Sequence, residues 1–130
     1  MTSKELLERY KWLTPRNVIT GKKLKNTNWI EIDNIAPGWR AAFGDKLCEE
    51  MNAIIQTWPV EEQEEFYIID IKEKWGRLCI YTSFTTDELE KVIEKYEALS
   101  TQTCYICGSS INTWHHNLPL CEICSVEFFN

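Results

Sequence analysis

Two Cys-x2-Cys pairs near the end of the chain constrain its fold more than any other feature. The pairs are Cys104–Cys107 and Cys121–Cys124, and thirteen residues separate them. Zinc binds four thiolates tetrahedrally at about 2.3 Å, and this gap lets a short hairpin return the second pair to the first. Gly108 can take the positive φ that a tight turn around the metal favours. The spacing predicts a structural Zn²⁺ site of four cysteines in a zinc-ribbon or treble-clef-like knuckle over residues 101–130.

His115 and His116 lie between the two pairs and are alternative metal ligands. We favour the four cysteines because their paired spacing is complete without a histidine. Two histidines between cysteine pairs also resemble the His-Asn-His nucleases, in which a zinc staple frames a second, catalytic metal. Only six residues follow Cys124 here, fewer than the further helix of such a finger needs. A metal-dependent nuclease is therefore the least favoured function.

Motifs of the common catalytic sites are missing from the sequence. It contains no Gly-x-Ser-x-Gly, no His-Glu-x-x-His and no glycine-rich phosphate loop. A catalytic zinc keeps one coordination position open, whereas four cysteines fill all of them. We therefore expect that the protein is not an enzyme.

Charge and cysteine usage limit the partners and the compartment. The formal net charge is −6, and four zinc-bound thiolates would bring it to about −8, which disfavours general affinity for nucleic acid. Cys48 and Cys79 stand apart from the pairs, as free thiols do in reducing compartments. No apolar run has the length of a signal peptide or of a membrane span. These observations predict a cytoplasmic protein without membrane association; its oligomeric state is left open.

Hydrophobic periodicity predicts an α+β body over residues 1–100, with helices packed on a β-hairpin. The first expected helix runs from Ser3 to Leu13, with Thr2 or Ser3 as its cap and Glu5 three positions after Thr2. The second runs from Pro37 to Trp58, and the third begins at Asp87, with Asp87 and Glu90 as capping pair. The expected strands are residues 66–71 and 78–82, joined by a turn at Gly76, with a short strand or extended segment at 29–32.

Cationic residues gather in two places. No acidic residue occurs from Arg9 to Ile30, a span that includes a loop-like stretch over 16–28. The second place is the turn Lys72-Glu-Lys-Trp-Gly-Arg77. One interpretation is a solvated loop and a charged turn with Trp75 folded onto the core. The other is a binding surface: the acid-free span would bind an anion or an acidic partner, and the turn a carboxylate-rich protein or a nucleic-acid strand. Its candidate residues are Lys72, Lys74, Trp75, Arg77, Lys22 and Lys23.

The stretch Ile71-Lys-Glu-Lys-Trp-Gly-Arg-Leu-Cys-Ile-Tyr81 resembles small phage, prophage and bacterial proteins of unassigned function. In these proteins a Lys-Glu-Lys-aromatic-Gly hairpin is followed by a helix and a Cys-x2-Cys-Gly segment. The resemblance covers roughly Pro37 to Cys124, but that family often closes with Cys-x2-His where this chain has Cys124. It brings no established chemistry. It implies a phage-type accessory protein that binds a host protein, such as a component of host defence, and modulates that protein by inhibiting it. A nucleic-acid-binding zinc module is the second hypothesis.

Overall fold

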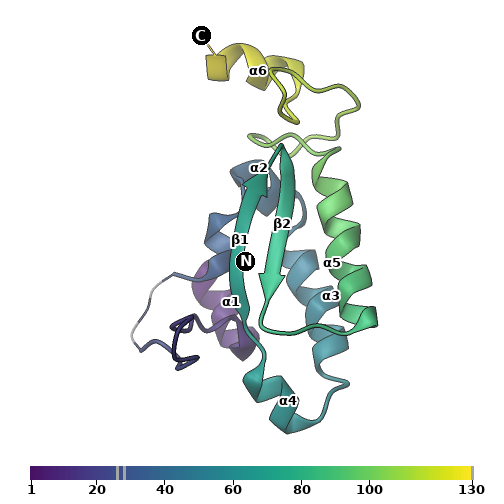
Figure 1. Ribbon diagram of the computed structural model, residues 1–130. Coiled ribbons are helices and arrows are strands. Elements are labelled where there is room, and N and C mark those ends of the chain that lie inside the picture. The colour runs from purple at the N-terminus through teal and green to yellow at the C-terminus, as the bar shows by residue number, and fades with distance from the viewer. Residues whose placement is uncertain (26, 28, 130) are drawn as a thin grey trace.

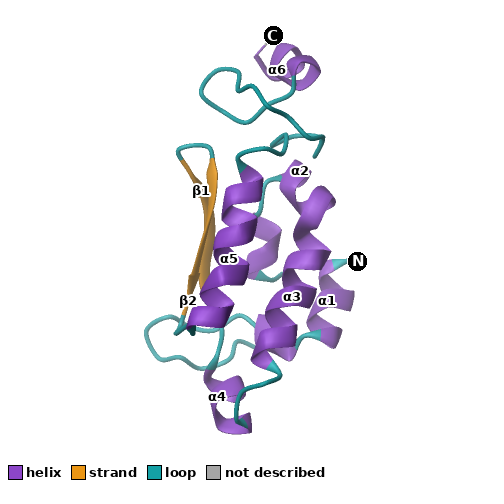
Figure 2. Cartoon of the chain, turned by 90° about the vertical axis from the view of Figure 1, so that its right-hand side faces the viewer, coloured by secondary structure: helices purple, strands orange, loops and turns teal. Residues whose placement is uncertain are grey.

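A two-stranded antiparallel hairpin, β1 (Ile68–Lys74) and β2 (Arg77–Thr82), is the only sheet among the described residues. The computed structural model describes residues 1–25, 27 and 29–129, without the side chains of 128 and 129. The helices are α1 (Ser3–Arg9), α2 (Pro37–Trp39), α3 (Asp45–Ile55), α4 (Val60–Glu65), α5 (Asp87–Ser100) and α6 (Glu122–Phe129). Helices α1, α3 and α5 lie on one side of the hairpin, and α6 lies beyond its turn (Figures 1 and 2). The predicted α+β class is confirmed.

The first helix begins at a capping box, as its sequence predicts. The Thr2 hydroxyl accepts from the Glu5 backbone N–H and the Glu5 carboxylate from the Thr2 N–H, each at 3.1 Å. The α-helix ends at Arg9, earlier than predicted, and a 3-10 turn, η1 (Lys11–Leu13), continues the chain. Leu6 and Leu13 are buried on the face that meets the core.

The predicted core helix is one continuous run of three segments, an α-helix, a π-helix and a second α-helix. Helix α2 leads into a π-helical segment, η3 (Arg40–Gly44), and then into α3, which ends at Ile55 rather than at the predicted Trp58. Its apolar stripe is buried as the periodicity predicts: Trp39, Phe43, Leu47, Met51 and Ile55. A π-helical turn adds one residue to the i→i−4 pattern. Apolar spacing over so few residues does not reveal that addition.

Residues 29–32 were predicted as a short strand or an extended segment, and the strand is wrong. Ile30 has an extended backbone, but a 3-10 helix, η2 (Glu31–Asn34), follows it. The Asp33 carboxylate accepts the Ile30 N–H at 2.9 Å. A local bond of this kind competes with a strand ladder, and it decides the outcome although the isoleucines favour a strand. In the preceding loop, the backbones of Arg16 and Lys23 form an isolated antiparallel β-bridge. Residues 26 and 28 of this loop lie outside the described residues.

Helix α5 covers the free edge of β2. The Leu78 N–H donates to the Ser100 hydroxyl and the Ile80 N–H to the Glu97 carboxylate, each at 3.0 Å. Side chains of α5 thus satisfy edge donors that could otherwise pair with another strand. The cap of α5 is Thr86, whose hydroxyl accepts the Leu89 N–H at 3.2 Å, one residue before the predicted pair.

Aromatic side chains fill one part of the core. Rings of Trp12, Trp58, Phe66 and Phe84 form a connected set, with centroids 5.2 to 5.8 Å apart. Such offset and edge-on pairs add to the burial of apolar area. Among the described residues, every helix is too short or too polar to cross a lipid bilayer.

Candidate functional site

The four predicted cysteines come together beyond the hairpin turn. Cys104 and Cys107 lie on a tight turn that follows α5, whereas Cys121 directly precedes α6 and Cys124 lies in its first turn. Their Sγ atoms all lie within 4.8 Å of one another. Leu120 and Cys104 are fully buried in a small apolar cluster with Cys124. The segment therefore has a core of its own around the sulfur atoms.

The sulfur geometry fits a four-coordinate metal. Metal–sulfur bonds of about 2.3 Å in a tetrahedron place the sulfur atoms about 3.8 Å apart. Cys107 Sγ and Cys121 Sγ are 3.8 Å apart. Backbone N–H groups also point at the sulfurs: Cys121 donates to Cys104 Sγ at 3.3 Å and Cys124 to Cys121 Sγ at 3.4 Å. Among the described residues, these cysteines are the group that could hold an ion.

Thiol acidity in the cluster also points to a cation. Burial opposes ionisation of Cys104, but N–H donation from Cys107, Cys121 and Ile106 outweighs it and lowers its pKa to about 6. The Cys124 thiol shifts the other way, because its hydrogen bond to Cys121 and its burial raise its pKa. Sulfur atoms this close cannot all carry charge unless a cation compensates them. The donor set therefore fits a metal ion bound by four thiolates.

Glycine allows the cysteine turn to pack directly on the body. Gly108 has φ +83°, the positive value predicted for it. A Cβ on Gly38, in α2, would lie 2.0 Å from the Cys104 carbonyl oxygen and 2.6 Å from the Gly108 nitrogen. The Gly38 N–H donates to the Tyr105 carbonyl at 2.8 Å, and the Trp39 indole to the Thr103 carbonyl at 3.0 Å. This close approach fixes the cysteine turn against α2.

The two histidines do not join the cysteines. His115 pairs with Leu118 in a small hairpin whose turn residues, His116 and Asn117, have φ of 57° and 63°. Neither histidine belongs to the metal-binding group found in the described part of the chain. The adjacent Trp114 instead contacts the body. Its indole donates to the Thr101 carbonyl at 2.8 Å, and its ring covers Gly76, where a Cβ would meet it at 2.7 Å.

The hairpin turn itself presents an exposed tryptophan. Trp75 and Gly76 form a two-residue turn with φ of 57° and 78°, closed by the Lys74–Arg77 pair. The Trp75 side chain is 86% exposed, so the interpretation that it folds onto the core is wrong. Because Trp114 lies against Gly76, the two indoles flank one turn. We call Lys74, Trp75, Arg77 and Trp114 the tip surface.

The structure separates the two groups of candidate cationic residues. The Arg16 guanidinium lies 4.9 Å from the Tyr67 ring centroid, just before β1, whereas Trp75 directly follows that strand. Seven strand residues span about 23 Å. Lys22 and Lys23 belong to the loop of Arg16, so they do not share a face with Lys74 and Arg77. Lys72 lies between, with its Nζ 3.8 Å from Asp70 and 5.2 Å from the Tyr81 ring centroid.

Comparison of the chain with protein families, with curated proteins and with solved structures gives no match. The site must therefore be interpreted from its own geometry. Sequence analysis missed Trp114 and Gly38 as parts of it. Trp114 and Gly76 are 38 positions apart in the sequence, and no local pattern links them.

Proposed function

We propose that this chain is a non-enzymatic protein in which a structural Zn²⁺ supports a partner-binding surface at the hairpin tip. The observation that carries the proposal is Trp75, an exposed indole held in a left-handed turn. The partner we propose is a protein that presents acidic residues around an apolar depression.

Zinc is the metal that four thiolates in a compact cluster favour. One pair comes from a tight turn and the other from the start of α6, an order of elements similar to a treble clef. Four sulfur ligands leave no open position for a substrate, which supports a structural role. Metal analysis of the protein purified without added metal should give one zinc per chain. A cysteine segment, residues 104–124, that folds with no metal bound would contradict this part.

The Trp75 indole contributes little to the stability of the fold, and a tryptophan is unfavourable in the left-handed backbone conformation of this position. A left-handed conformation costs a bulky L-residue about 1–2 kcal/mol, and this turn position normally favours Asn, Asp or Gly. With 86% exposure the indole recovers little of that cost by burial. Residues in unfavourable backbone conformations cluster at sites of binding or catalysis. Tryptophan and arginine are also the side chains most enriched in interface hot spots.

Charge around Trp75 supports an acidic partner. Lys74 and Arg77 flank the indole, and Lys72 lies two residues before Lys74 on β1. No salt bridge engages Lys74 or Arg77 within the described part of the chain. Their charges remain available to carboxylates of a partner. The resemblance to phage and prophage proteins leads us to propose a host protein, including a component of host defence, as that partner, and inhibition as the outcome.

The test is affinity capture from a bacterial lysate with matched variants. The wild-type chain, Trp75→Asn and Ile19→Ser are immobilised, and bound proteins are identified by mass spectrometry. Ile19 is 91% exposed in the distant loop, so its variant controls for loss of any exposed apolar side chain. We expect a stoichiometric protein that Trp75→Asn loses and Ile19→Ser keeps. Retention by Trp75→Asn would remove the tip surface from the proposal.

One observation favours a nucleic-acid strand as the second candidate. An exposed indole between cations suits base stacking with phosphate contacts. The net charge of −6 opposes it. Fluorescence anisotropy with single-stranded DNA and RNA across a salt series separates the candidates. A steep fall of affinity with salt, lost in Trp75→Asn, would favour the strand; no binding at about 50 mM salt would exclude it.

A further inference from the structure

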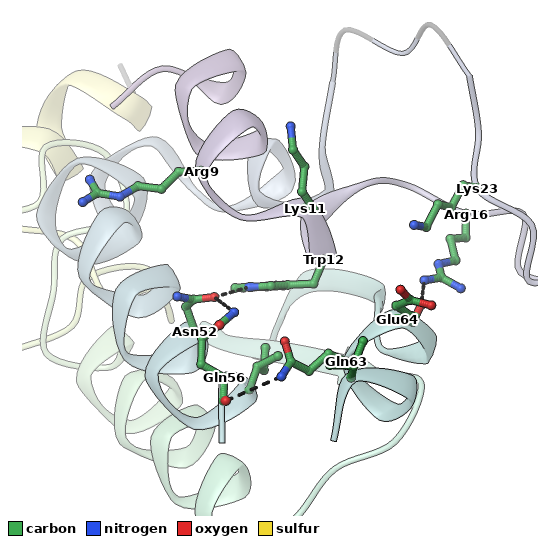
Figure 3. Close-up of a pocket in the computed structure, with 11 residues that line it drawn as sticks. Arg9, Lys11, Trp12, Arg16, Lys23, Asn52, Gln56, Gln63 and Glu64 are labelled. Carbon is green, nitrogen blue, oxygen red and sulfur yellow. Dashed lines mark hydrogen bonds between the residues drawn. The ribbon is translucent and has the colours of Figure 1, made fainter. Parts of the chain in front are cut away.

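A second site lies away from the tip surface, where the acid-free stretch of the chain meets α3 and α4. Its cavity has a volume of about 280 Å³. The side chains of Trp12, Asn52, Gln56 and Gln63 lie between Arg9 on one side and Arg16 and Lys23 on the other (Figure 3). The cationic lining residues are Arg9, Lys11, Arg16 and Lys23, and Glu64 is the one carboxylate among the described lining residues. We call this cavity the cationic pocket.

The cations of the cationic pocket are not paired with carboxylates in the part of the chain that the structure describes. Among the described residues, none of its four cations forms a salt bridge. Arg16 donates instead to the backbone carbonyls of Gly21 and Glu64, and its Nε is buried without a hydrogen-bond partner. A buried guanidinium donor without an acceptor is unfavourable. The protein therefore holds an arginine in place by neutral groups and leaves its charge unpaired.

The base of the pocket is an ordered set of amides. The Trp12 indole N–H donates to Asn52 Oδ1 at 3.1 Å, and Gln56 Nε2 donates to the same oxygen at 3.4 Å. Gln63 Nε2 donates to the Trp58 carbonyl at 2.7 Å. The Asn52 Nδ2 group makes no hydrogen bond with any residue that the structure describes. It is a free donor beside the cations, as ligand sites with a few placed polar groups provide.

We propose that the cationic pocket binds the phosphoryl group of a small molecule. Four cations against one carboxylate leave an excess that a monocarboxylate would not balance, whereas a phosphoryl group carries up to two charges. Guanidinium and ammonium groups are the side chains that recognise phosphate. A cavity of about 280 Å³ is close to the lower end of the volumes of small-molecule sites.

Isothermal titration calorimetry with inorganic pyrophosphate tests this site at about 50 mM salt, where surface charge is weakly screened. The variants are Lys11→Gln and Lys23→Gln, both exposed lysines of the pocket. Lys22→Gln is the matched control, because it removes the same charge from the neighbouring residue outside the lining. We expect the pocket variants to weaken binding about tenfold and the control less than about twofold.

Three results would overturn the proposal. They are no binding of pyrophosphate by the wild-type chain, equal weakening by Lys22→Gln, and equal affinity for citrate, a polycarboxylate of similar size. A nucleoside diphosphate distinguishes the sources of the phosphoryl group. Tighter binding than pyrophosphate would support a nucleotide-like ligand that also contacts the amides. Equal binding would support recognition of the phosphoryl groups alone.

Discussion

Trp75 destabilises the fold through its backbone conformation, but it is the residue that we propose binds the partner. Its φ of 57° is unfavourable for a tryptophan, and the following Gly76 has φ of 78°. Asn-Gly is the pair that such a turn favours. We expect Trp75→Asn to raise the free energy of unfolding by about 1 kcal/mol, measured by urea denaturation, while it abolishes partner binding.

The control for this prediction is Trp75→Ala. Alanine removes the indole but keeps the cost of the left-handed backbone, so it should lose binding without the gain in stability. Loss of stability in Trp75→Asn would show that the indole packs on the body, contrary to its exposure.

Glu97 provides a test of pH dependence. Burial raises its pKa, although donation from the Ile80 N–H and the charge of Arg77 partly oppose the rise. As pH rises, the unfolded chain loses this proton first, near pH 4.3, and the folded chain loses it later. Stability from this group therefore falls between about pH 4.3 and the raised folded pKa and is flat above it.

Glu97→Gln removes that ionisation and keeps an oxygen that can accept the Ile80 N–H. We expect a higher Tm than wild type at pH 7, with the difference shrinking as pH falls toward 4. Glu88→Gln, an exposed carboxylate on the same helix, should show no such pH-dependent gain. A gain that is constant with pH would rule out ionisation of Glu97 as the cause.

Individual residues were predictable from the sequence where the determining neighbours are close in the chain. The Thr2–Glu5 capping box and the positive φ of Gly76 and Gly108 follow from residues within a few positions. The cap of α5 was misplaced by one residue because Thr86 and Asp87 are both good caps. The exposure of Trp75 could not be predicted, since aromatic residues are usually buried.

Among the elements, the contact between α2 and the cysteine turn is the most sensitive to substitution. A Cβ on Gly38 would lie within 2.8 Å of three backbone atoms, which cannot move as a side chain can. We expect Gly38→Ala to lower the free energy of unfolding by about 1–3 kcal/mol, measured by chemical denaturation of the zinc-loaded protein.

Gly44→Ala is the matched control in the same helical run. The three atoms nearest to its Cβ all belong to the Arg40 side chain, the closest at 2.9 Å, and a side chain can shift where backbone atoms cannot, although Arg40 is paired with Asp45. Helix propensity also favours alanine over glycine. Equal destabilisation by both substitutions would mean that the loss arises within the helix and not at the cysteine turn.

Existence and order of the main elements were predicted, whereas the π-helical and 3-10 segments were not. Apolar spacing indicates the core helix, and β-branched runs indicate the hairpin. The π-helical segment Arg40–Gly44 leaves little trace in that spacing. The 3-10 turn at Glu31–Asn34 depends on one carboxylate, that of Asp33. Strand propensity alone does not contain such a bond.

At the scale of the whole molecule, two cationic sites occur in a chain of net charge −6. The tip surface and the cationic pocket lie near opposite ends of β1. Linear sequence shows that both stretches are basic, but their separation follows from the path of the hairpin. One partner of ordinary size could contact the tip surface without reaching the pocket. The two proposals can therefore fail independently.

Metal removal tests how the parts of the molecule depend on each other. Zinc binding contributes on the order of 10 kcal/mol to the folding of small thiolate modules. The segment after α5 has only a small apolar cluster besides its cysteines. We expect a strong chelator to abolish amide protection over residues 104–124 in hydrogen exchange, while α3 and α5 keep theirs. Residues 1–100 and 101–130 would then be separate folding units, as the sequence predicts.

The same treatment should weaken partner binding without unfolding the hairpin, because Trp114 on Gly76 depends on the cysteine segment for its position. Cys107→Ser should reproduce the effect of the chelator, since it removes one ligand at an exposed position. Cys79→Ser, outside the cluster, should leave both metal content and binding unchanged. Loss of protection throughout the chain on chelation would show one cooperative unit. Unchanged binding after metal loss would show that Trp75 acts without support from the metal centre.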